Sequence, residues 1–428
     1  MRRAAVAALG VVLLATTARA ADVSGEWEFT TKVLDDVTYA RVALKADGEK
    51  LSGSLNELKL EGTIKGDEVA FTATRPNGQR FGEFKGRANG DELKGTVSGP
   101  AIPGGGETTW TGRRARKAPS APRVHDFEPT VFHRVFSDAI PPVLHLFPGD
   151  TVRTWTVDAG GTDSKGVRRS LGGNPETGPF YVEGAFPGDT LVVKLNKVRL
   201  NRDSAISSGQ ISGNALTPGY LQRTRYRTDF DSDWVLDRQS GIGRLKNPSE
   251  HLKNYTVKLQ PMLGCIAVAP PAHQSFRTGY PGTFGGNMDY NQLREGTTVY
   301  LPVSVPGALL FVGDGHAAQG DGELTGNALE TSMDVEFTVD VIRGQSTGAP
   351  RAENDEYWMS SGIGNSLTDA LQLATTQLVN WLERDYKLDP NEAAVVLGTA
   401  MRYDIAEVVD PLVHIVAKIR KDAVALLK

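Results

Sequence analysis

The stretch Leu301-Pro-Val-Ser-Val-Pro-Gly-Ala-Leu-Leu-Phe-Val-Gly-Asp-Gly-His-Ala-Ala-Gln-Gly-Asp-Gly-Glu323 joins apolar runs to glycine-rich turns. The stretch Tyr280-Pro-Gly-Thr-Phe-Gly-Gly-Asn-Met-Asp-Tyr290, just before it, has the same character. Glycine-rich turns between buried strands let the backbone and polar side chains approach a small ligand closely. The two stretches therefore predict a β-rich body that carries a small-ligand site on its turns.

Both stretches are rich in side chains that can bind a cation. These are Asn287, Asp289, Asp314, His316, Gln319, Asp321 and Glu323. A divalent metal needs a few hard oxygens and an imidazole brought together from adjacent loops. Asn and Asp beside Gly also shape ordinary turns. The residue types alone leave a metal site and a set of structural turns both open.

The β pattern extends outward from this region, from residue 125 to about 350. Phe-Pro-Gly-Asp-Thr occurs twice, at 147–151 and 186–190, each time between two apolar runs. Pro followed by Gly suits the central positions of a type II turn. Each copy is therefore predicted to be the turn of a hairpin.

The character of the sequence changes near the C-terminus, and residues 351–428 are predicted to be helical. Residues 366–383 carry an amphipathic pattern behind Ser366, which can cap a helix. Residues 389–398 and 410–420 each begin with Asp-Pro, which places Pro in the first helical turn. Together, residues 125–428 are predicted to form a sandwich- or barrel-like β body with C-terminal helices.

The part of the chain before residue 125 divides into three segments. Residues 21–113 alternate short β-prone runs with Asp-Gly and Asn-Gly-Asp turns, which predicts a small antiparallel β domain. It contains no His or Cys, so no chemistry is assigned to it. Residues 114–124 are basic and contain Pro, as is typical of a linker. Residues 1–20 have the basic, apolar and small-residue order of a signal peptide cut after Ala20.

Composition limits the kinds of partner and compartment. The leader predicts a periplasmic or secreted protein, and no apolar run after Ala20 is long enough to span a bilayer. Losing the three arginines of residues 1–20 moves the formal charge from −4 to −7, and the excess is spread out, which argues against nucleic acid as a partner. Cys265 is the only cysteine, so no intramolecular disulfide can form.

Several of these motifs resemble the acetamidase/formamidase family. The match runs through residues 285–289, 301–309 and 313–323, and continues in 174–189, 261–270 and 408–411. The resemblance implies an amidase, a hydrolase that cleaves the C–N bond of short linear amides to a carboxylate and ammonia. It also implies a small-molecule amide substrate, a homo-oligomer and a metal-assisted site. Residues 204–241 depart from the family pattern, so the substrate itself stays open.

The resemblance also carries roles onto individual positions. Asp289, His316 and Glu323 would hold a metal, and Asn287 would be an orienting amide. Glu183 would supply a second carboxylate, with Glu183 or Glu323 as general base, and His133 matches a family histidine. A divalent metal is expected, zinc ahead of calcium, with no organic cofactor. The alternative is a noncatalytic periplasmic ligand-binding or scaffolding protein that keeps the amidase fold.

Overall fold

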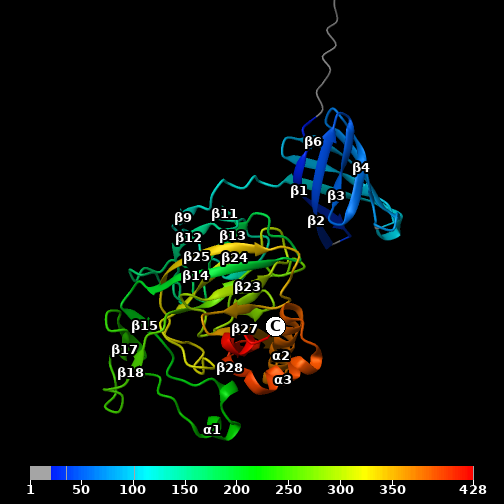
Figure 1. The fold of residues 1–428 in the computed structure, drawn as a ribbon. Helices are drawn as coiled ribbons and strands as arrows, with labels where there is room; N and C mark the ends of the chain where they lie inside the picture. Colours follow the sequence, from blue (N-terminus) through cyan, green and yellow to red (C-terminus); the bar gives the residue numbers. More distant parts are fainter. Residues whose placement is uncertain (1–20, 35, 101, 428) are drawn as a thin grey trace, which may run out of the picture. The chain divides into compact units, whose positions relative to one another are not determined.

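The chain divides near residue 116. In the computed structural model, which describes residues 21–34, 36–100 and 102–427, one unit is Met1–Arg116 and the other is Lys117–Lys428 (Figure 1). The predicted signal peptide at residues 1–20 lies outside the described residues, so export stays a prediction. Within the described residues, no helix has the length and apolar character that a membrane crossing requires.

The first unit is a closed barrel of eight antiparallel strands in chain order, with β1 hydrogen-bonded to β8. The small antiparallel β domain predicted from the turn spacing is thereby confirmed as a barrel. A short 3-10 turn, η1 (Pro103–Gly105), precedes the last strand. The strands are β1 (Gly25–Val33), β2 (Asp36–Asp47), β3 (Lys50–Leu55), β4 (Leu58–Lys65), β5 (Glu68–Thr74), β6 (Arg80–Asn89), β7 (Glu92–Ser98) and β8 (Glu107–Arg114).

Aromatic side chains pack the interior of this barrel. Phe29 stacks on Trp110 with ring centroids 4.5 Å apart, and Phe71 stacks on Phe84 at 5.0 Å. In β5, buried and partly exposed residues alternate, which is the period-two pattern of a strand with one face inward. The barrel therefore has its own hydrophobic core.

The second unit is built around two sheets that share one hydrophobic core. The six-stranded sheet has the order β11-β13-β24-β19-β22-β21, with bounds β11 (Leu144–Leu146), β13 (Thr177–Val182), β19 (Met262–Ala267), β21 (Pro281–Gly282), β22 (Gly285–Asn287) and β24 (Leu310–His316). The nine-stranded sheet has the order β28-β29-β27-β26-β23-β14-β25-β12-β9, with bounds β9 (Val124–Asp126), β12 (Thr151–Trp155), β14 (Thr190–Leu200), β23 (Thr298–Pro302), β25 (Met333–Ile342), β26 (Arg351–Glu353), β27 (Tyr357–Gly364), β28 (Arg402–Glu407) and β29 (Val413–Arg420).

Smaller elements complete this unit. A four-stranded sheet contains β15 (Ser204–Ile206), β16 (Asp233–Asp237), β17 (Ile242–Leu245) and β18 (Thr256–Lys258), and a two-stranded sheet pairs β10 (Val135–Phe136) with β20 (Phe276–Arg277). The helical elements are η2 (Gly213–Ala215), α1 (Pro218–Arg223), α2 (Leu367–Tyr386), α3 (Pro390–Ala400) and α4 (Lys421–Val424). The predicted fold class, a β body with C-terminal helices, is confirmed.

The two Phe-Pro-Gly-Asp-Thr turns connect the sheets instead of closing hairpins. β11 and β13 belong to the six-stranded sheet, whereas β12 and β14, which follow the turns, belong to the nine-stranded sheet. Gly149 and Gly188 have φ of 90° and 93°, as the second central position of a type II turn requires. The hairpin prediction was wrong because a tight turn fixes the reversal of the chain but not which strand it then pairs with.

Two of the three predicted C-terminal helices are present. Ser366 caps α2 by accepting a hydrogen bond from the Asp369 amide at 3.1 Å, and Asp389 with Glu392 forms a capping box on α3. The third prediction, a helix over 410–420, was wrong, because residues 413–420 form β29. Residues 351–428 are consequently not a helical segment, since they also contain β26, β27 and β28.

Strand pairing explains why β29 is not a helix. β29 contains β-branched side chains, which favour a strand, at Val413, Ile415, Val416 and Ile419. β29 pairs along its whole length with β27 and also with β28, so its backbone groups are satisfied on both sides. Its buried side chains divide between the core shared by the two sheets and the core under α2. The Asp-Pro start was a local signal that this pairing overrode.

Asp150, in the first of the two turns, is a buried carboxylate that fixes the turn. Burial alone would raise its pKa, but hydrogen bonds from the Phe147 amide, His125 and Arg123 lower the pKa to about 2. Because the folded-state pKa lies below the ordinary 3.8, this carboxylate stabilises the fold above about pH 4. That stability is lost as the pH falls toward 2.

Replacing this carboxylate is therefore expected to cost stability in a pH-dependent way. Asp150→Asn should lower the free energy of unfolding by about 2 kcal/mol at pH 7, and by much less near pH 2. Urea unfolding followed by fluorescence measures both values. Asp126→Asn, at an exposed carboxylate on β9, is the matched control and should be near neutral. Equal losses for Asp150→Asn at the two pH values would contradict the account.

Candidate metal centre

The two central strands of the six-stranded sheet bring the candidate residues together. β24 ends in Asp314 and His316, and all seven of its residues are buried. β19 pairs with it antiparallel, with Met262 opposite His316. A Cβ atom at Gly264 on β19 would collide with the carboxylate of Asp289, and would lie 2.7 Å from Asp314 Oδ2 and 3.0 Å from His316 Cε1. Three side chains therefore converge over Gly264, where there is no side chain to block them.

Four carboxylates surround the His316 imidazole. Nε2 of His316 lies 3.2 Å from Glu330 Oε2 and 3.5 Å from Asp314 Oδ2, while Nδ1 lies 3.9 Å from Asp289 Oδ1. The ligand atoms form two overlapping groups, Asp289 with His316 and Glu323, and Asp314 with His316 and Glu330, each within 4.8 Å. We call these five residues the acidic cluster. Glu323 is the most exposed of them, at 7%.

Strained backbone holds three of the four carboxylates in place. Asp289, Asp314 and Glu323 have φ of 40°, 52° and 44°, in the left-handed region that residues other than glycine rarely adopt. Such conformations persist only where the surrounding structure enforces them, and they concentrate at functional sites. The directions of these carboxylates are therefore specific features of the fold.

The charges of the acidic cluster are not balanced by its own residues. Burial raises the pKa of Asp289, with the negative charges of Glu323 and Asp314 adding to the effect. Burial also raises the pKa of Glu323 and of Glu330, against the opposing pull of His316. The pKa of His316 would fall on burial, but Glu330 and Asp314 raise it well above its usual range. One imidazolium cannot neutralise four buried carboxylates, so a further positive charge fits here.

Unpartnered atoms point to the same conclusion. Among the described residues, Asp289 Oδ1, Asp314 Oδ1, His316 Nε2 and Glu330 Oε2 are buried without a hydrogen-bond partner. Buried polar atoms without partners are rare in native proteins and call for an explanation. Ligands of a tetrahedral metal site lie about 3.4 Å apart when the metal–ligand bonds are about 2.1 Å. The separations of 3.2 and 3.5 Å around Nε2 fit that spacing.

Gln319 determines which nitrogen of His316 is free. Its Nε2 donates to the carbonyl oxygens of Asp289 and Ala406, so its Oε1 must face His316 Nδ1, 2.9 Å away. Nδ1 therefore carries a hydrogen and donates it to Gln319. This leaves Nε2, on the side of Asp314 and Glu330, free to bind a cation. A metal-binding histidine is usually held by a hydrogen bond of this kind from its other nitrogen.

Known proteins share both the sequence and the fold around this cluster. The model of the Acetamidase/Formamidase family matches residues 267–410, which contain all five cluster residues. Over these residues the chain is similar to the acetamidase/formamidase family. Acetamidase from Yersinia enterocolitica has 28% identity and a TM-score of 0.60, over 72% of this chain and 95% of its own. A Thermoanaerobacter tengcongensis structure titled as a predicted acetamidase/formamidase has 26% identity and a TM-score of 0.61, over 72% of this chain and 99% of its own.

Curated relatives match over a shorter length. The formamidase of Methylophilus methylotrophus is 27% identical over 264 residues, 49% of this chain and 64% of that protein. A Schizosaccharomyces pombe protein named as a formamidase is 30% identical over 194 residues, 35% of this chain and 47% of that protein. The chain thus spans about half to two thirds of the length of these two relatives.

Four of the six residues singled out from the sequence lie in or against the acidic cluster. Asp289, His316 and Glu323 belong to it, and their role as metal ligands stays a prediction. Asn287 lies beside it as an orienting amide would, because its Nδ2 donates to Asp289 and, at 2.7 Å, to Asp410. Asn174 in turn donates to Asn287 Oδ1 at 2.9 Å and to Asp314 Oδ2 at 3.0 Å.

The structure places Glu183 away from the acidic cluster. It follows β13 at the end remote from the cluster and pairs with His145 at 2.7 Å. Because Phe180 pairs with Leu310 and the strands are antiparallel, Glu183 and His316 lie at opposite ends of these strands, on the order of 30 Å apart at about 3.3 Å per residue. Glu183 is therefore not the general base of this cluster.

His133 lies at the edge of the site and not inside it. Its amide and carbonyl pair with those of Glu176, while its ring packs edge-on against Phe311. Burial lowers the pKa of His133. Burial, and then the charges of Glu176 and Asp314, raise the pKa of the Cys265 thiol, so this thiol is not primed as a nucleophile.

The sequence reasoning missed several acidic residues of the site. Glu330 lies beside His316 because the two residues form an isolated β-bridge. The other acidic residues that were missed are Glu176, Glu407 and Asp410. Burial raises the pKa of Asp410 to about 7. Burial and the nearby charge of Asp410 raise the pKa of Glu407 to about 8. Glu176 and Asp410 lie in the stretches 174–189 and 408–411 that carried the family resemblance. That resemblance was the signal that could have found them.

The absence of a side chain at Gly264 generates a direct prediction. Gly264→Ala should displace Asp289 and Asp314, and so lower the affinity of chelator-treated protein for added Zn²⁺ by at least about tenfold. Isothermal titration calorimetry measures the affinity. Gly279→Ala is the matched control, because a Cβ atom there meets nothing within 4 Å. Unchanged zinc affinity in Gly264→Ala would show that cations bind elsewhere.

Proposed function

We propose that this chain is an amidase that hydrolyses the C–N bond of small linear amides, such as formamide and acetamide, to a carboxylate and ammonia. The observation that carries the proposal is the set of buried, unpartnered ligand atoms around His316 Nε2. Similarity to this family supports the reaction class, since relatives are named formamidase and acetamidase. The metal and the general base belong to the proposal as well.

His316, Asp314 and Glu330 are the residues that would hold a divalent cation. They converge from β24 and from the bridge beside it, and Gln319 leaves Nε2 of His316 facing the two carboxylates. An imidazole with two carboxylates is a typical donor set for zinc. When bound, such a cation supplies Lewis-acid polarisation of an oxygen ligand.

Glu323 is the carboxylate best suited to move the proton. Its pKa is raised well above the ordinary value by burial and by the charges of Glu330 and Asp314, with His316 opposing them. A carboxylate of raised pKa can accept a proton from water and give it up again near neutral pH. In hydrolysis, water oxygen bonds to the carbonyl carbon as Glu323 takes its proton. The C–N bond then breaks as Glu323 returns a proton to the nitrogen.

Neighbouring amides hold the acidic residues in position for this chemistry. Asn287 ties Asp289 to Asp410, and Asn174 ties Asn287 to Asp314. Because these amides donate to carboxylates, they fix the carboxylate directions without adding charge. All five cluster residues are buried, so only a small substrate can reach them.

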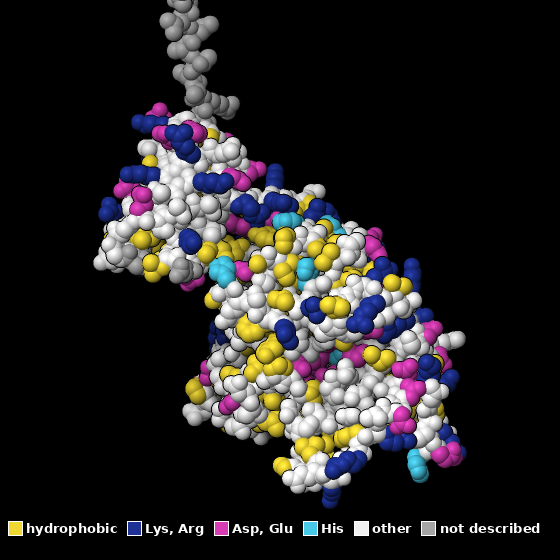
Figure 2. Space-filling view, turned by 180° about the vertical axis from the view of Figure 1, so that it is seen from behind, with side chains coloured by type: hydrophobic (Ala, Val, Ile, Leu, Met, Phe, Trp, Pro, Cys, Tyr) yellow, Lys and Arg dark blue, Asp and Glu magenta, His cyan; other side chains and the backbone are white. Residues whose placement is uncertain are grey.

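That nucleic acid is not a partner stays a prediction from the sequence. On the face shown in Figure 2, Lys and Arg side chains are interspersed with Asp and Glu. A nucleic acid backbone is bound by a continuous basic track, which this face does not offer. A small-molecule substrate is the partner that the buried cluster suits. Homo-oligomerisation, which the resemblance implied, stays a prediction.

The proposal is tested by ammonia release from formamide, acetamide and larger linear amides. Zinc-loaded wild-type protein should release ammonia, and removal of the metal with a chelator should abolish release, with recovery on adding zinc back. Glu323→Gln should lower kcat at least about hundredfold, because it removes the proton acceptor. His316→Ala should lose activity and also zinc.

Glu183→Gln is the matched control, since it makes the same chemical change at a buried carboxylate away from the cluster. It should keep activity within about twofold of wild type. If folded, zinc-loaded wild type released no ammonia from any of these amides, the hydrolase would be excluded. The noncatalytic ligand-binding protein would then be the better description.

A further inference from the structure

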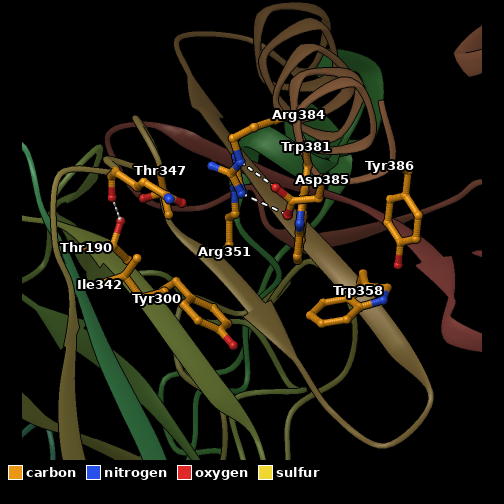
Figure 3. Close-up of a pocket in the computed structure, with 11 residues that line it drawn as sticks. Thr190, Tyr300, Ile342, Thr347, Arg351, Trp358, Trp381, Arg384, Asp385 and Tyr386 are labelled. Carbon is orange, nitrogen blue, oxygen red and sulfur yellow. Dashed lines mark hydrogen bonds and ion pairs between the residues drawn. The ribbon is translucent and has the colours of Figure 1, made fainter. Parts of the chain in front are cut away.

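A cavity lies between the nine-stranded sheet and helix α2, apart from the acidic cluster. Its volume is about 400 Å³, within the range of roughly 300–1,000 Å³ typical of small-molecule sites. Arg351 on β26 and Trp358 on β27 line it from the sheet, while Trp381, Arg384 and Asp385 line it from the C-terminal part of α2 (Figure 3). No residue of the acidic cluster lines it.

The cavity lies on the side of the sheet that faces away from the shared core. Ala352 and Met359, the strand neighbours of Arg351 and Trp358, belong to the core between the two sheets. Because successive side chains of a strand alternate in direction, Arg351 and Trp358 point to the opposite side, toward α2. The cavity is thus separated from the acidic cluster by the sheet and its core.

Arg351 is a buried cation that forms no ion pair with any described residue, and the carboxylate of Asp385 favours its charge only at longer range. Arg351 is only 5% exposed, and its Nε has no hydrogen-bond partner among the described residues. The guanidinium lies over the ring of Trp381, 4.6 Å from its centroid, which stabilises the charge without neutralising it. Burial and then the nearby charge of Arg384 lower the pKa of Arg351 to about 10, which still leaves it charged at neutral pH. A buried, unpaired charge is costly unless a partner binds it.

The second guanidinium of the cavity is already paired. Arg384 forms a two-bond ion pair with Asp385, with Nη2 and Oδ2 2.9 Å apart, drawn as dashed lines in Figure 3. The cavity therefore has one uncompensated positive charge, that of Arg351. This balance fits a monoanion, and the carboxylate of Asp385 would repel an anion of higher charge.

Aromatic rings form much of the remaining wall. Trp358 and Trp381 meet edge to face, with centroids 4.9 Å apart and planes at 73°. Tyr300 and Tyr386 also line the cavity, and the other lining residues are Thr190, Ile342, Gln345 and Thr347. Flat, apolar rings of this kind bury a flat, apolar ligand body. The wall chemistry and the charge together describe an organic anion and not an inorganic one.

We propose that this cavity binds a small monocarboxylate with a flat apolar body, whose carboxylate pairs with Arg351 and whose body packs against the rings that line the cavity, Trp358 and Trp381 among them. The guanidinium fork matches a carboxylate in geometry as well as charge. Such a ligand would join α2 to the sheet and so stabilise the folded protein. The site is independent of the amidase proposal.

Benzoate is the probe that tests this site, with benzyl alcohol as its neutral counterpart of similar shape. Isothermal titration calorimetry on the full chain should show saturable benzoate binding, and benzoate should raise the melting temperature. Benzyl alcohol should bind at least about tenfold more weakly, because it lacks the charge that pairs with Arg351. Equal binding of the two, or no benzoate binding at millimolar concentration, would overturn the proposal.

Variants locate the binding. Arg351→Met, which keeps an unbranched apolar stem but removes the guanidinium, should weaken benzoate binding at least about tenfold, whereas Arg244→Met on β17 should leave it unchanged. Asp385→Asn, at the surface end of the cavity, should strengthen binding because it removes a repelling charge, and it gives an independent test if Arg351→Met is unstable. His316→Ala should not affect benzoate. If His316→Ala lost benzoate binding and Arg351→Met kept it, benzoate would bind at the acidic cluster and the proposal would be contradicted. Tighter binding of inorganic phosphate than of benzoate would also contradict it.

Discussion

The second unit depends on burying four carboxylates around one imidazole. Mutual repulsion and loss of water both oppose this arrangement, so it can persist only if the surrounding structure enforces it and a positive charge balances it. The enforcement is visible in the left-handed backbone of Asp289, Asp314 and Glu323 and in the bare position at Gly264. The Gln319 amide adds direction, since it leaves one nitrogen of His316 facing two carboxylates. These features are difficult to explain as mere packing and agree with a cation site.

The two-sheet body provides the rigidity that this cluster needs. β24 and β19 are central strands, flanked on both sides, and their apolar residues pack into the core shared with the nine-stranded sheet. Side chains held on central strands are more precisely positioned than side chains on free loops. The N-terminal barrel, by contrast, has a separate aromatic core and contributes no residue to the cluster. Chemistry and accessory structure are therefore divided between the units.

The sequence predicted what is local and failed where distant segments meet. Asp289, His316 and Glu323 could be found because glycine-rich turns place them within one region, and the α2 cap at Ser366 was equally local. Glu330 could not be found this way, because it reaches His316 only through strand pairing. Glu183 and Glu176 flank the same strand, β13, and only the sheet shows that Glu176 lies at the cluster end. β29 was mistaken for a helix because its partners β27 and β28 are set by the tertiary fold.

A divalent cation is expected on the Nε2 side of His316, and anomalous diffraction would detect it directly. Crystals of the protein purified without added chelator would be measured on both sides of the zinc absorption edge, with elemental analysis of the same sample. The account predicts about one equivalent of metal and an anomalous peak among His316 Nε2, Asp314 and Glu330. A peak between Asp289 and Glu323 on the Nδ1 side, or metal-free protein that cannot be loaded with zinc or calcium, would contradict it.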